Sequence, residues 1–414
     1  MNNFFKNNYH ILTYILLYSS LIIAFYFNEN VAGGAKLDLQ YTLKQVQLFE
    51  ANFVYSFLNY DNIEFPNRLS PIYISILVIF KKIFVNFDFA RFILMHIVLL
   101  SQIFFYKSLK TIYCNKFSLD KKIIFTLSCI ILISPSFRSN IIWVESSMFG
   151  LLFFIIGLYY FLKNFKTFKQ KNVYLNILFV AIAAYIRPSY CLFAIYFFYS
   201  YCTIFRKSIS IPKIILTNFI LAFPAYYYVF IMEIFFIEFG GLSNNYFNKI
   251  AIILSIIFFH IFPFFYYKNY FIKTTNKVSI ILLSLLLSLT LIFYFNYDIS
   301  LGGGGIFLHL SNFLLNNNNI FFLLIPFFIF YLINVCRINF INNSIIILIL
   351  LLITPQYHIF HKYYDPLVLI LCLTIIDFKL EKNFFIEKKY IFFCYFVMLG
   401  HYFLTYINTY YIKF

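Results

Sequence analysis

Residues 70–86 decide the topology of this chain. They read Ser-Pro-Ile-Tyr-Ile-Ser-Ile-Leu-Val-Ile-Phe-Lys-Lys-Ile-Phe-Val-Asn, and their only charged side chains are Lys81 and Lys82. A membrane-spanning helix needs about 20 apolar residues, and somewhat fewer where protein surrounds it. If this stretch crosses the membrane, every later loop changes side.

The composition places the stretch in a membrane protein. Hydrophobic residues make up 63% of the chain and charged residues 11%, with a mean hydropathy of +0.83. Soluble domains are roughly half apolar and about a quarter charged, and a water-soluble fold of this length would have no way to hide so much apolar surface. The sequence therefore predicts a polytopic, all-α integral membrane protein.

Apolar runs predict about thirteen transmembrane helices. They lie near residues 11–27, 91–106, 123–135, 147–162, 173–186, 188–205, 213–232, 249–267, 278–296, 320–336, 343–355, 366–376 and 390–408. The first run resembles a signal peptide in one respect, because Val31-Ala32-Gly33 is like a cleavage site. Its apolar region is long for that role, so we expect a span.

The distribution of Lys and Arg places residues 70–86. If this stretch does not cross and the N-terminus is cytoplasmic, twenty basic residues fall in inner loops: Lys107, Lys110, Lys116, Lys121, Lys122, Lys163, Lys166, Lys169, Lys171, Arg206, Lys207, Lys213, Lys268, Lys273, Lys277, Arg337, Lys379, Lys382, Lys388 and Lys389. Beyond position 92 the outer side then holds only Arg138, Arg187, Lys249, Lys362 and Lys413. Because Lys and Arg favour cytoplasmic loops, we expect an interfacial helix over 70–86 within a first outer loop of 28–90. The whole chain, 1–414, is expected to form one membrane domain.

The net charge of +17 does not indicate a nucleic-acid partner, because the basic residues are scattered between apolar segments. Short Lys clusters beside spans act as topology signals and contact anionic membrane lipids. The seven cysteines form no C-x-x-C pair. Neither a disulfide framework nor a cysteine metal site is expected.

Polar and ionisable residues gather on the predicted outer side, where such groups are costly unless paired or wetted. The first loop carries Asp38, Glu50, Asp61, Glu64 and Arg68, and four glycines at 302–305 precede a later histidine. The other candidates on this side are Arg138, Glu145, Arg187, His309, His358, His361, Lys362, Tyr364 and Asp365.

Each candidate also has a plainer interpretation. Asp38 is equally well read as a solvated loop acid, and Arg138 and Glu145 as residues at helix ends. Arg187 can extend to lipid headgroups without further function. The glycine run can be a flexible linker. His358 and His361 alone are weak as a metal site, so we expect no particular metal ligand, and a divalent metal stays an open possibility.

Taken in order, these features resemble the GT-C superfamily of membrane glycosyltransferases. Asp38 stands where those enzymes carry a catalytic acid in a long first outer loop, and Ser70-Pro71-Ile72-Tyr73 is similar to their Pro-x-Tyr-like segment. Ser134-Pro135 with Glu145, and Ala183-Ala184-Tyr185-Ile186-Arg187-Pro188, resemble their later outer turns. Residues 354–366 are similar to a late outer loop of the dolichyl-phosphate-glucose glucosyltransferases. The first loop has no Asp-Asp, Asp-Glu or Asp-x-Asp pair.

The resemblance implies a transferase that uses a polyprenyl-phosphate-linked sugar as donor and a glycan or lipid as acceptor. It also implies a bacterial inner membrane with the active site facing outside. The phosphate is already a good leaving group, so one carboxylate suffices as base for the acceptor hydroxyl, and we assign it to Asp38. Arg187, Arg138 and Lys362 are candidates to neutralise the phosphate. Tyr363 and Tyr364 are candidates to stack on a sugar ring.

Other functions fit the sequence less well. A lipid-linked polysaccharide polymerase or ligase usually has its large outer loop late in the chain, whereas here the long loop comes first. A carrier or flippase is expected to place ionisable residues in the middle of spans, and this chain keeps nearly all of them at loop edges. A non-catalytic membrane scaffold is the remaining alternative.

Overall fold

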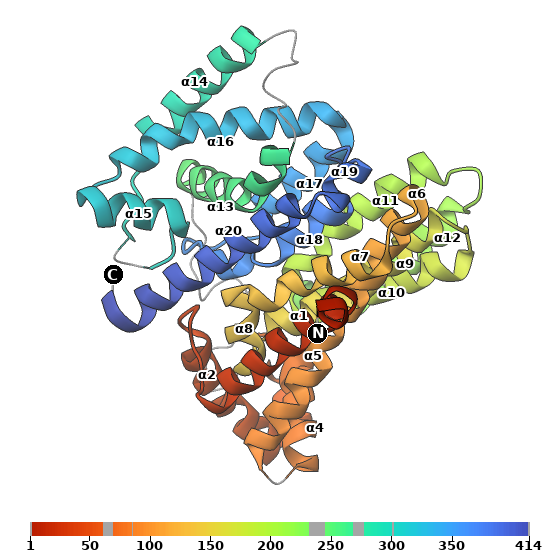
Figure 1. Cartoon of the computed structure of the whole chain (residues 1–414). Helices are drawn as coiled ribbons and strands as arrows, with labels where there is room; N and C mark the ends of the chain where they lie inside the picture. Colours follow the sequence, from red (N-terminus) through yellow and green to blue (C-terminus); the bar gives the residue numbers. More distant parts are fainter. Residues whose placement is uncertain are drawn as a thin grey trace. The chain divides into compact units, whose positions relative to one another are not determined.

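A computed structural model describes residues 2–60, 69–84, 86–231, 245–267, 277–299 and 302–412. Its regular elements are all helices, and this described part contains no β-strand (Figure 1). Together with the apolar composition, this confirms a helical, multi-pass membrane protein. The chain divides into two compact units, Met1–Phe239 and Gly240–Phe414, and each is treated by itself below. The expectation of a single domain stays a prediction.

Among the described residues, unit 1 contains the first twelve α-helices. They are α1 (Asn2–Tyr26), α2 (Ala35–Ala51), α3 (Phe53–Leu58), α4 (Pro71–Ile83), α5 (Phe87–Leu109), α6 (Asn115–Phe117), α7 (Lys121–Ser128), α8 (Pro135–Ile142), α9 (Ser146–Asn164), α10 (Gln170–Ile186), α11 (Phe193–Ile204) and α12 (Ile211–Tyr226). Short 3-10 turns at Cys129–Ile133 and Pro188–Leu192 extend α7 and precede α11. Single π-helical turns follow α5 and α12.

Unit 2 contains the remaining eight. They are α13 (Tyr246–Tyr267), α14 (Lys277–Phe293), α15 (Gly305–Leu315), α16 (Asn319–Ile338), α17 (Phe340–Leu352), α18 (Leu367–Thr374), α19 (Lys382–Ile386) and α20 (Lys388–Ile407). A 3-10 turn, His361–Tyr363, interrupts the segment between α17 and α18. Helix α13 packs against α15, α16, α17, α18 and α20, and it forms the centre of this unit.

Each of the thirteen predicted spans coincides with helix in the structure. Within the described residues, seven helices are long and apolar enough to cross a membrane, and an eighth results if one bent pair counts as a single span. They lie over α1, α5, α9, α12, α13, α16 and α20, and three of them, Phe87–Cys114, Ile211–Phe230 and Lys388–Tyr410, continue into the π-helical turn that follows the α-helix. The predicted span at 366–376 is a helix of only 8 residues, all but the last of them buried. Such a helix is about 12 Å long, too short to cross alone. The full count of thirteen crossings stays a prediction.

The predicted first outer loop, residues 28–90, contains more helix than residues 70–86 alone. Helix α4 begins where predicted, since the Ser70 hydroxyl accepts a hydrogen bond from the amide of Ile72 and Pro71 occupies the first turn. It is 13 residues long and is not among the candidate spans. Before it lies α2, whose buried face packs against α4, with an ion pair of 2.6 Å between Lys81 and Glu50.

A sharp break separates α7 and its 3-10 extension from α8. The two segments, Lys121–Ile133 and Pro135–Ile142, are bent by 68°. Pro135 disfavours helical geometry at the residue before it, and Ser134 is extended there, with its hydroxyl accepting a hydrogen bond from the amide of Phe137. Every residue of α8 is buried, so this short helix lies inside unit 1.

Candidate functional site

Asp38 lies in the first turn of α2, just after Gly33 and Gly34. Both glycines have positive φ, 62° and 72°, a region that favours glycine, so the turn into α2 depends on them. The side chain of Asp38 is half-buried. A carboxylate at a helix N-terminus is stabilised by the helix dipole.

Tyr73 interacts electrostatically with two predicted site residues, Glu145 and Asp38. Its ring is 1% exposed, and its hydroxyl donates a hydrogen bond to the carbonyl of Val144. Burial raises the pKa of Tyr73 well above its usual value, and the neighbouring carboxylates of Glu145 and then Asp38 raise it further. Two predicted site residues from separate loops, one of them buried Glu145, therefore share a neighbourhood.

A set of hydrogen bonds fastens the start of the first loop to α8. Glu29 accepts two bonds from Arg138, 2.9 Å from Nε and 3.0 Å from Nη2. The carbonyl of Glu29 accepts a bond from the Trp143 indole at 2.8 Å. The Ser139 hydroxyl accepts one from the amide of Ala32 at 2.9 Å. These contacts hold the residues that lead directly into α2 and Asp38.

Arg138 thus has protein partners of its own. Its Nη1 also donates to the Ser20 hydroxyl at 3.0 Å, and the residue is 5% exposed. Nearby, Arg91 donates to the carbonyl of Ile142 and lies 4.3 Å from the centre of the Trp143 ring. The structure therefore gives Arg138 a role in joining α1 to α8, and its predicted contact with a donor phosphate stays a prediction.

Arg187 ends α10 and packs beside α9. A Cβ atom built on Gly150 would lie 3.0 Å from the Arg187 Cβ and 2.8 Å from the Tyr190 ring, so the glycine permits this close approach. Gly150 lies in α9, five residues after Glu145, which is the residue just before that helix. The turn that carries Arg187 consequently packs near the N-terminal end of the helix that Glu145 precedes.

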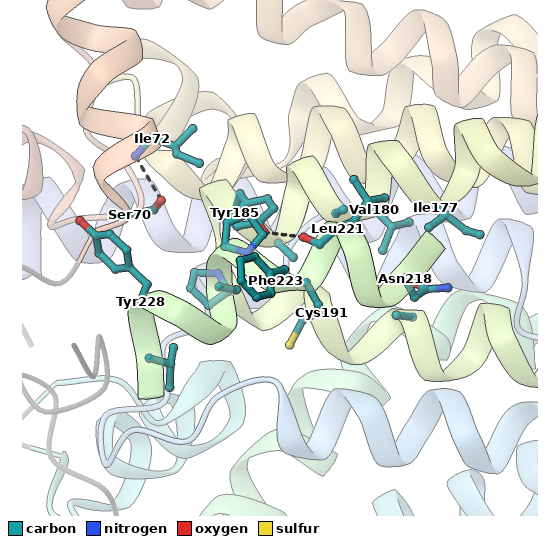
Figure 2. Close-up of a pocket in the computed structure, with 18 of the residues that line it drawn as sticks. Ser70, Ile72, Ile177, Val180, Tyr185, Cys191, Asn218, Leu221, Phe223 and Tyr228 are labelled. Carbon is teal, nitrogen blue, oxygen red and sulfur yellow. Dashed lines mark hydrogen bonds between the residues drawn. The ribbon is translucent and has the colours of Figure 1, made fainter. Parts of the chain in front are cut away.

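An apolar cavity of about 850 Å³ adjoins these residues in unit 1. It is lined by side chains of α10, α11 and α12, by Pro188 and Cys191, and by Ser70, Pro71 and Ile72 (Figure 2). Its wall extends along α10 from Asn176 to Tyr185, about 14 Å of helix. Pockets of roughly 300–1,000 Å³ bury most of a drug-sized ligand. This one has room for a hydrocarbon chain.

In unit 2 the glycine run packs against the segment between α17 and α18. Gly302, Gly303, Gly304 and Gly305 all have positive φ. A Cβ on Gly303 would lie 2.8 Å from the carbonyl oxygen of Ile359, and the amide of Gly304 donates to that same carbonyl at 3.0 Å. Nε2 of His309 lies 2.7 Å from the carbonyl oxygen of Gly303, within hydrogen-bond distance. Glycine is therefore required here by close backbone packing.

The other predicted residues of unit 2 lie between α17 and α18. His358 stacks on Phe360, and the Lys362 ammonium lies 5.7 Å from the centre of the Phe360 ring. Tyr364 is fully buried and donates a hydrogen bond of 3.0 Å to the Thr354 hydroxyl, and Asp365 is also buried. Contact of Tyr364 or Asp365 with a substrate stays a prediction, and in this arrangement protein surrounds both side chains.

Five residues that lie beside the predicted site residues were not themselves among the sequence candidates. They are Glu29, Tyr73, Trp143 and, beside His361, His260 and His401. Glu50 forms the ion pair described above, while Asp61, Glu64 and Arg68 lie outside the described residues. Within the described part of the chain, no group of three or more His, Cys, Asp or Glu side chains is arranged to hold a metal ion.

Comparison with known proteins adds nothing to these observations, because no family model, curated protein or solved structure matches the chain.

Proposed function

We propose that this protein is a membrane glycosyltransferase. It would move a sugar from a polyprenyl-phosphate donor to a glycan or lipid acceptor at the outer face of a bacterial inner membrane. The observation that carries the proposal is the position of α4. Its first residues, Pro71 and Ile72, line the apolar cavity, and the next residue, Tyr73, contacts the segment that bears Glu145 and lies near Asp38.

This arrangement supports a donor with an apolar tail and a polar head. A hydrocarbon chain in the cavity gains about 0.8 kcal/mol for each CH₂ group it removes from water. A tail there would leave the phosphate and sugar near the N-terminal end of α4, the helix whose Tyr73 interacts with Glu145 and Asp38.

The proposed chemistry is a single displacement at the anomeric carbon. The acceptor hydroxyl oxygen forms a bond to that carbon, the bond from the carbon to the phosphate oxygen breaks, and the polyprenyl phosphate leaves with the electron pair. Asp38 takes the hydroxyl proton, as a general base. Arg187 offers a planar, permanently charged guanidinium to the departing phosphate. The configuration at the anomeric carbon is inverted.

The test is transfer of a radiolabelled sugar from polyprenyl-phosphate-glucose or polyprenyl-phosphate-mannose in proteoliposomes, with membrane lipid and glycan fractions as acceptors. Asp38→Asn removes the base with little change in volume, so transfer should fall by at least ~10²-fold while polyprenyl phosphate still binds within a few-fold. Glu50→Gln is the matched control, since it also neutralises an acid of α2 but one paired with Lys81, and it should be much milder.

Two results would contradict the proposal. If Asp38→Asn transfers normally and Glu145→Gln is inactive, the base is Glu145. If neither acid matters, the protein is not a transferase of this kind. The length of the product distinguishes a transferase from the polymerase alternative, because a polymerase yields long chains and a transferase adds a single sugar.

One observation favours the carrier alternative. His260 and His401 are buried within candidate spans, α13 and α20, where ionisable residues often belong to transport or proton pathways. A carrier would move the lipid-linked sugar across the proteoliposome membrane without breaking its glycosidic bond. The same radiolabelled donor detects this outcome, because its label would change sides but stay attached to the lipid.

A further inference from the structure

Three histidines from three separate elements meet in unit 2. His361 belongs to the turn between α17 and α18, His260 to α13 and His401 to α20. The ring centre of His361 lies 4.5 Å from that of His401 and 5.2 Å from that of His260. The imidazole at the start of this short 3-10 turn is thus inserted against two helices that qualify as membrane spans.

The ring nitrogens of this cluster are buried without hydrogen bonds. Among the described residues, five ring nitrogens of the cluster have no hydrogen-bond partner. They are both nitrogens of His260, both nitrogens of His361 and Nδ1 of His401. Buried polar atoms are nearly always satisfied, so such a group calls for an explanation. The cluster does not have the geometry of a metal site. Neutral rings are held together here mainly by packing, with Phe259 in contact with all three.

The segment that carries His361 is attached along α13. At one end the Lys249 ammonium donates a hydrogen bond to the carbonyl of Pro355. At the other end His361 meets His260, eleven residues further along the same helix and so about 16 Å away. A fully extended chain of six residues spans about 20 Å, so the segment from Pro355 to His361, which bends at Tyr357, is long enough to follow α13 over this distance. The ring of His361 therefore fixes the far end of the segment.

A positive charge on His361 would be strongly disfavoured in this position. The titratable groups that face it are His260 from α13, His401 from α20 and His309 from α15; its own segment adds His358, Lys362 and Asp365. Burial, and to a smaller extent His309, lowers the pKa of His361 from its usual value to about 3. A released side chain would regain a pKa of about 6.5. Docking is therefore fully favourable above pH 6.5 and weakens as the pH falls from 6.5 towards 3.

We propose that His361 is an acid-released latch, which holds the outer segment 355–361 against α13 and α20 in its neutral form and lets the segment go when the exterior is acidified. The latch is independent of the proposed transferase activity. Protonation converts the ring from a packed neutral group into a cation surrounded by other imidazoles, and water outside then becomes its better environment. Release would free the carbonyl of Ile359 from the glycine run and uncover His260 and His401.

Hydrogen exchange measured by mass spectrometry on the full protein in lipid nanodiscs tests the latch. The probes are the amides of Tyr363, Tyr364 and Asp365, which donate within the His361 turn, read on a peptide covering 354–366 and corrected for the intrinsic effect of pH. Because release takes up one proton, exchange should rise about tenfold for each pH unit below 6.5, or about 30-fold by pH 5. A peptide from α16 should not change and reports any general acid unfolding.

His361→Gln should remove the pH dependence, since glutamine cannot take up the proton, while His358→Gln on the same segment should keep it. Corrected exchange that is equal at pH 7 and pH 5 in the wild-type protein would overturn the proposal. A slope that survives in His361→Gln would do the same. If that variant does not reach the membrane, His361→Asn replaces it, and the wild-type titration still decides.

Discussion

Arg138 on α8 holds Glu29, three residues beyond the end of α1, through two parallel hydrogen bonds of 2.9 and 3.0 Å. The side chains of Arg138 and Glu29 are only 6% and 10% exposed, respectively. A pair this well shielded is costly to break, because each charge would be left in a poorly solvated place without the other. The contact connects the first helix to the loop that leads to Asp38.

The ion pair makes a first prediction about stability. Arg138→Ala should destabilise the protein by about 3–5 kcal/mol, since Glu29 would stay buried and uncompensated. Thermal unfolding of the purified protein in detergent measures the loss. Lys389→Ala is the control, because its pair with Glu387 is exposed, and it should leave the unfolding temperature unchanged. The double variant Glu29→Arg with Arg138→Glu exchanges the two charges and should recover part of the lost stability. Equal stability of the wild type and Arg138→Ala would show that the ion pair is unimportant.

The second prediction concerns the donor phosphate. Arg187→Lys keeps the charge but loses the planar fork that binds a phosphate through two hydrogen bonds. We expect weaker use of the polyprenyl-phosphate donor in Arg187→Lys and near-complete loss in Arg187→Ala, with unchanged expression in the membrane. Initial rates of sugar transfer at several donor concentrations give the comparison. Full activity of the alanine variant would leave Arg187 as an anchor to lipid headgroups.

The cavity provides a third prediction. Ala181 lines it, so Ala181→Trp should fill part of the space and raise the donor KM, by about tenfold for each 1.4 kcal/mol of lost contact. Leu178→Trp is the matched control on α10, because Leu178 is exposed and does not line the cavity. Binding of polyprenyl phosphate, measured by its displacement of a fluorescent analogue, reports the effect directly. Equal weakening by both variants would indicate a general defect in α10.

The fourth prediction is topological. Single cysteines introduced at Lys116 and Lys169 should react only with reagents that reach the cytoplasm, and those at Asn59 and Asn317 only with reagents outside. The expectation follows from the excess of Lys and Arg in the proposed inner loops. If Asn59 and Asn317 are labelled from opposite sides, a segment assigned to the interface or to a span is placed wrongly.

The sequence was sufficient to predict the long apolar helices, because long apolar runs leave few alternatives in a membrane. It did not separate a true crossing from a short buried helix such as α18, since both are equally apolar. Helix α2 was not predicted at all. Its buried face includes Thr42 and Gln45, so it carries no clear apolar periodicity, and it owes its position to packing on α4.

The candidate site was predictable only in part. The predicted outer position and the charge were enough to select Asp38 and Glu145. Their common neighbour Tyr73 was noted only as part of the Ser-Pro-Ile-Tyr motif. The partner of Arg138 was not foreseen, because Glu29 is 109 residues away in the sequence and no local pattern joins them. His260 and His401 stand singly in apolar runs. Their meeting with His361 depends on three-dimensional packing.

The contact between Glu29 and Arg138 of α8 has a consequence for biosynthesis. Glu29 leaves the ribosome 109 residues before Arg138, an interval of roughly 5–20 s at the usual pace of translation. A short segment with an arginine has little tendency to enter lipid by itself. The first helix, already inserted and carrying a carboxylate at its end, would act as a template that receives α8 when it is made. A nascent chain without that helix would leave α8 at the membrane surface, exposed to quality-control proteases.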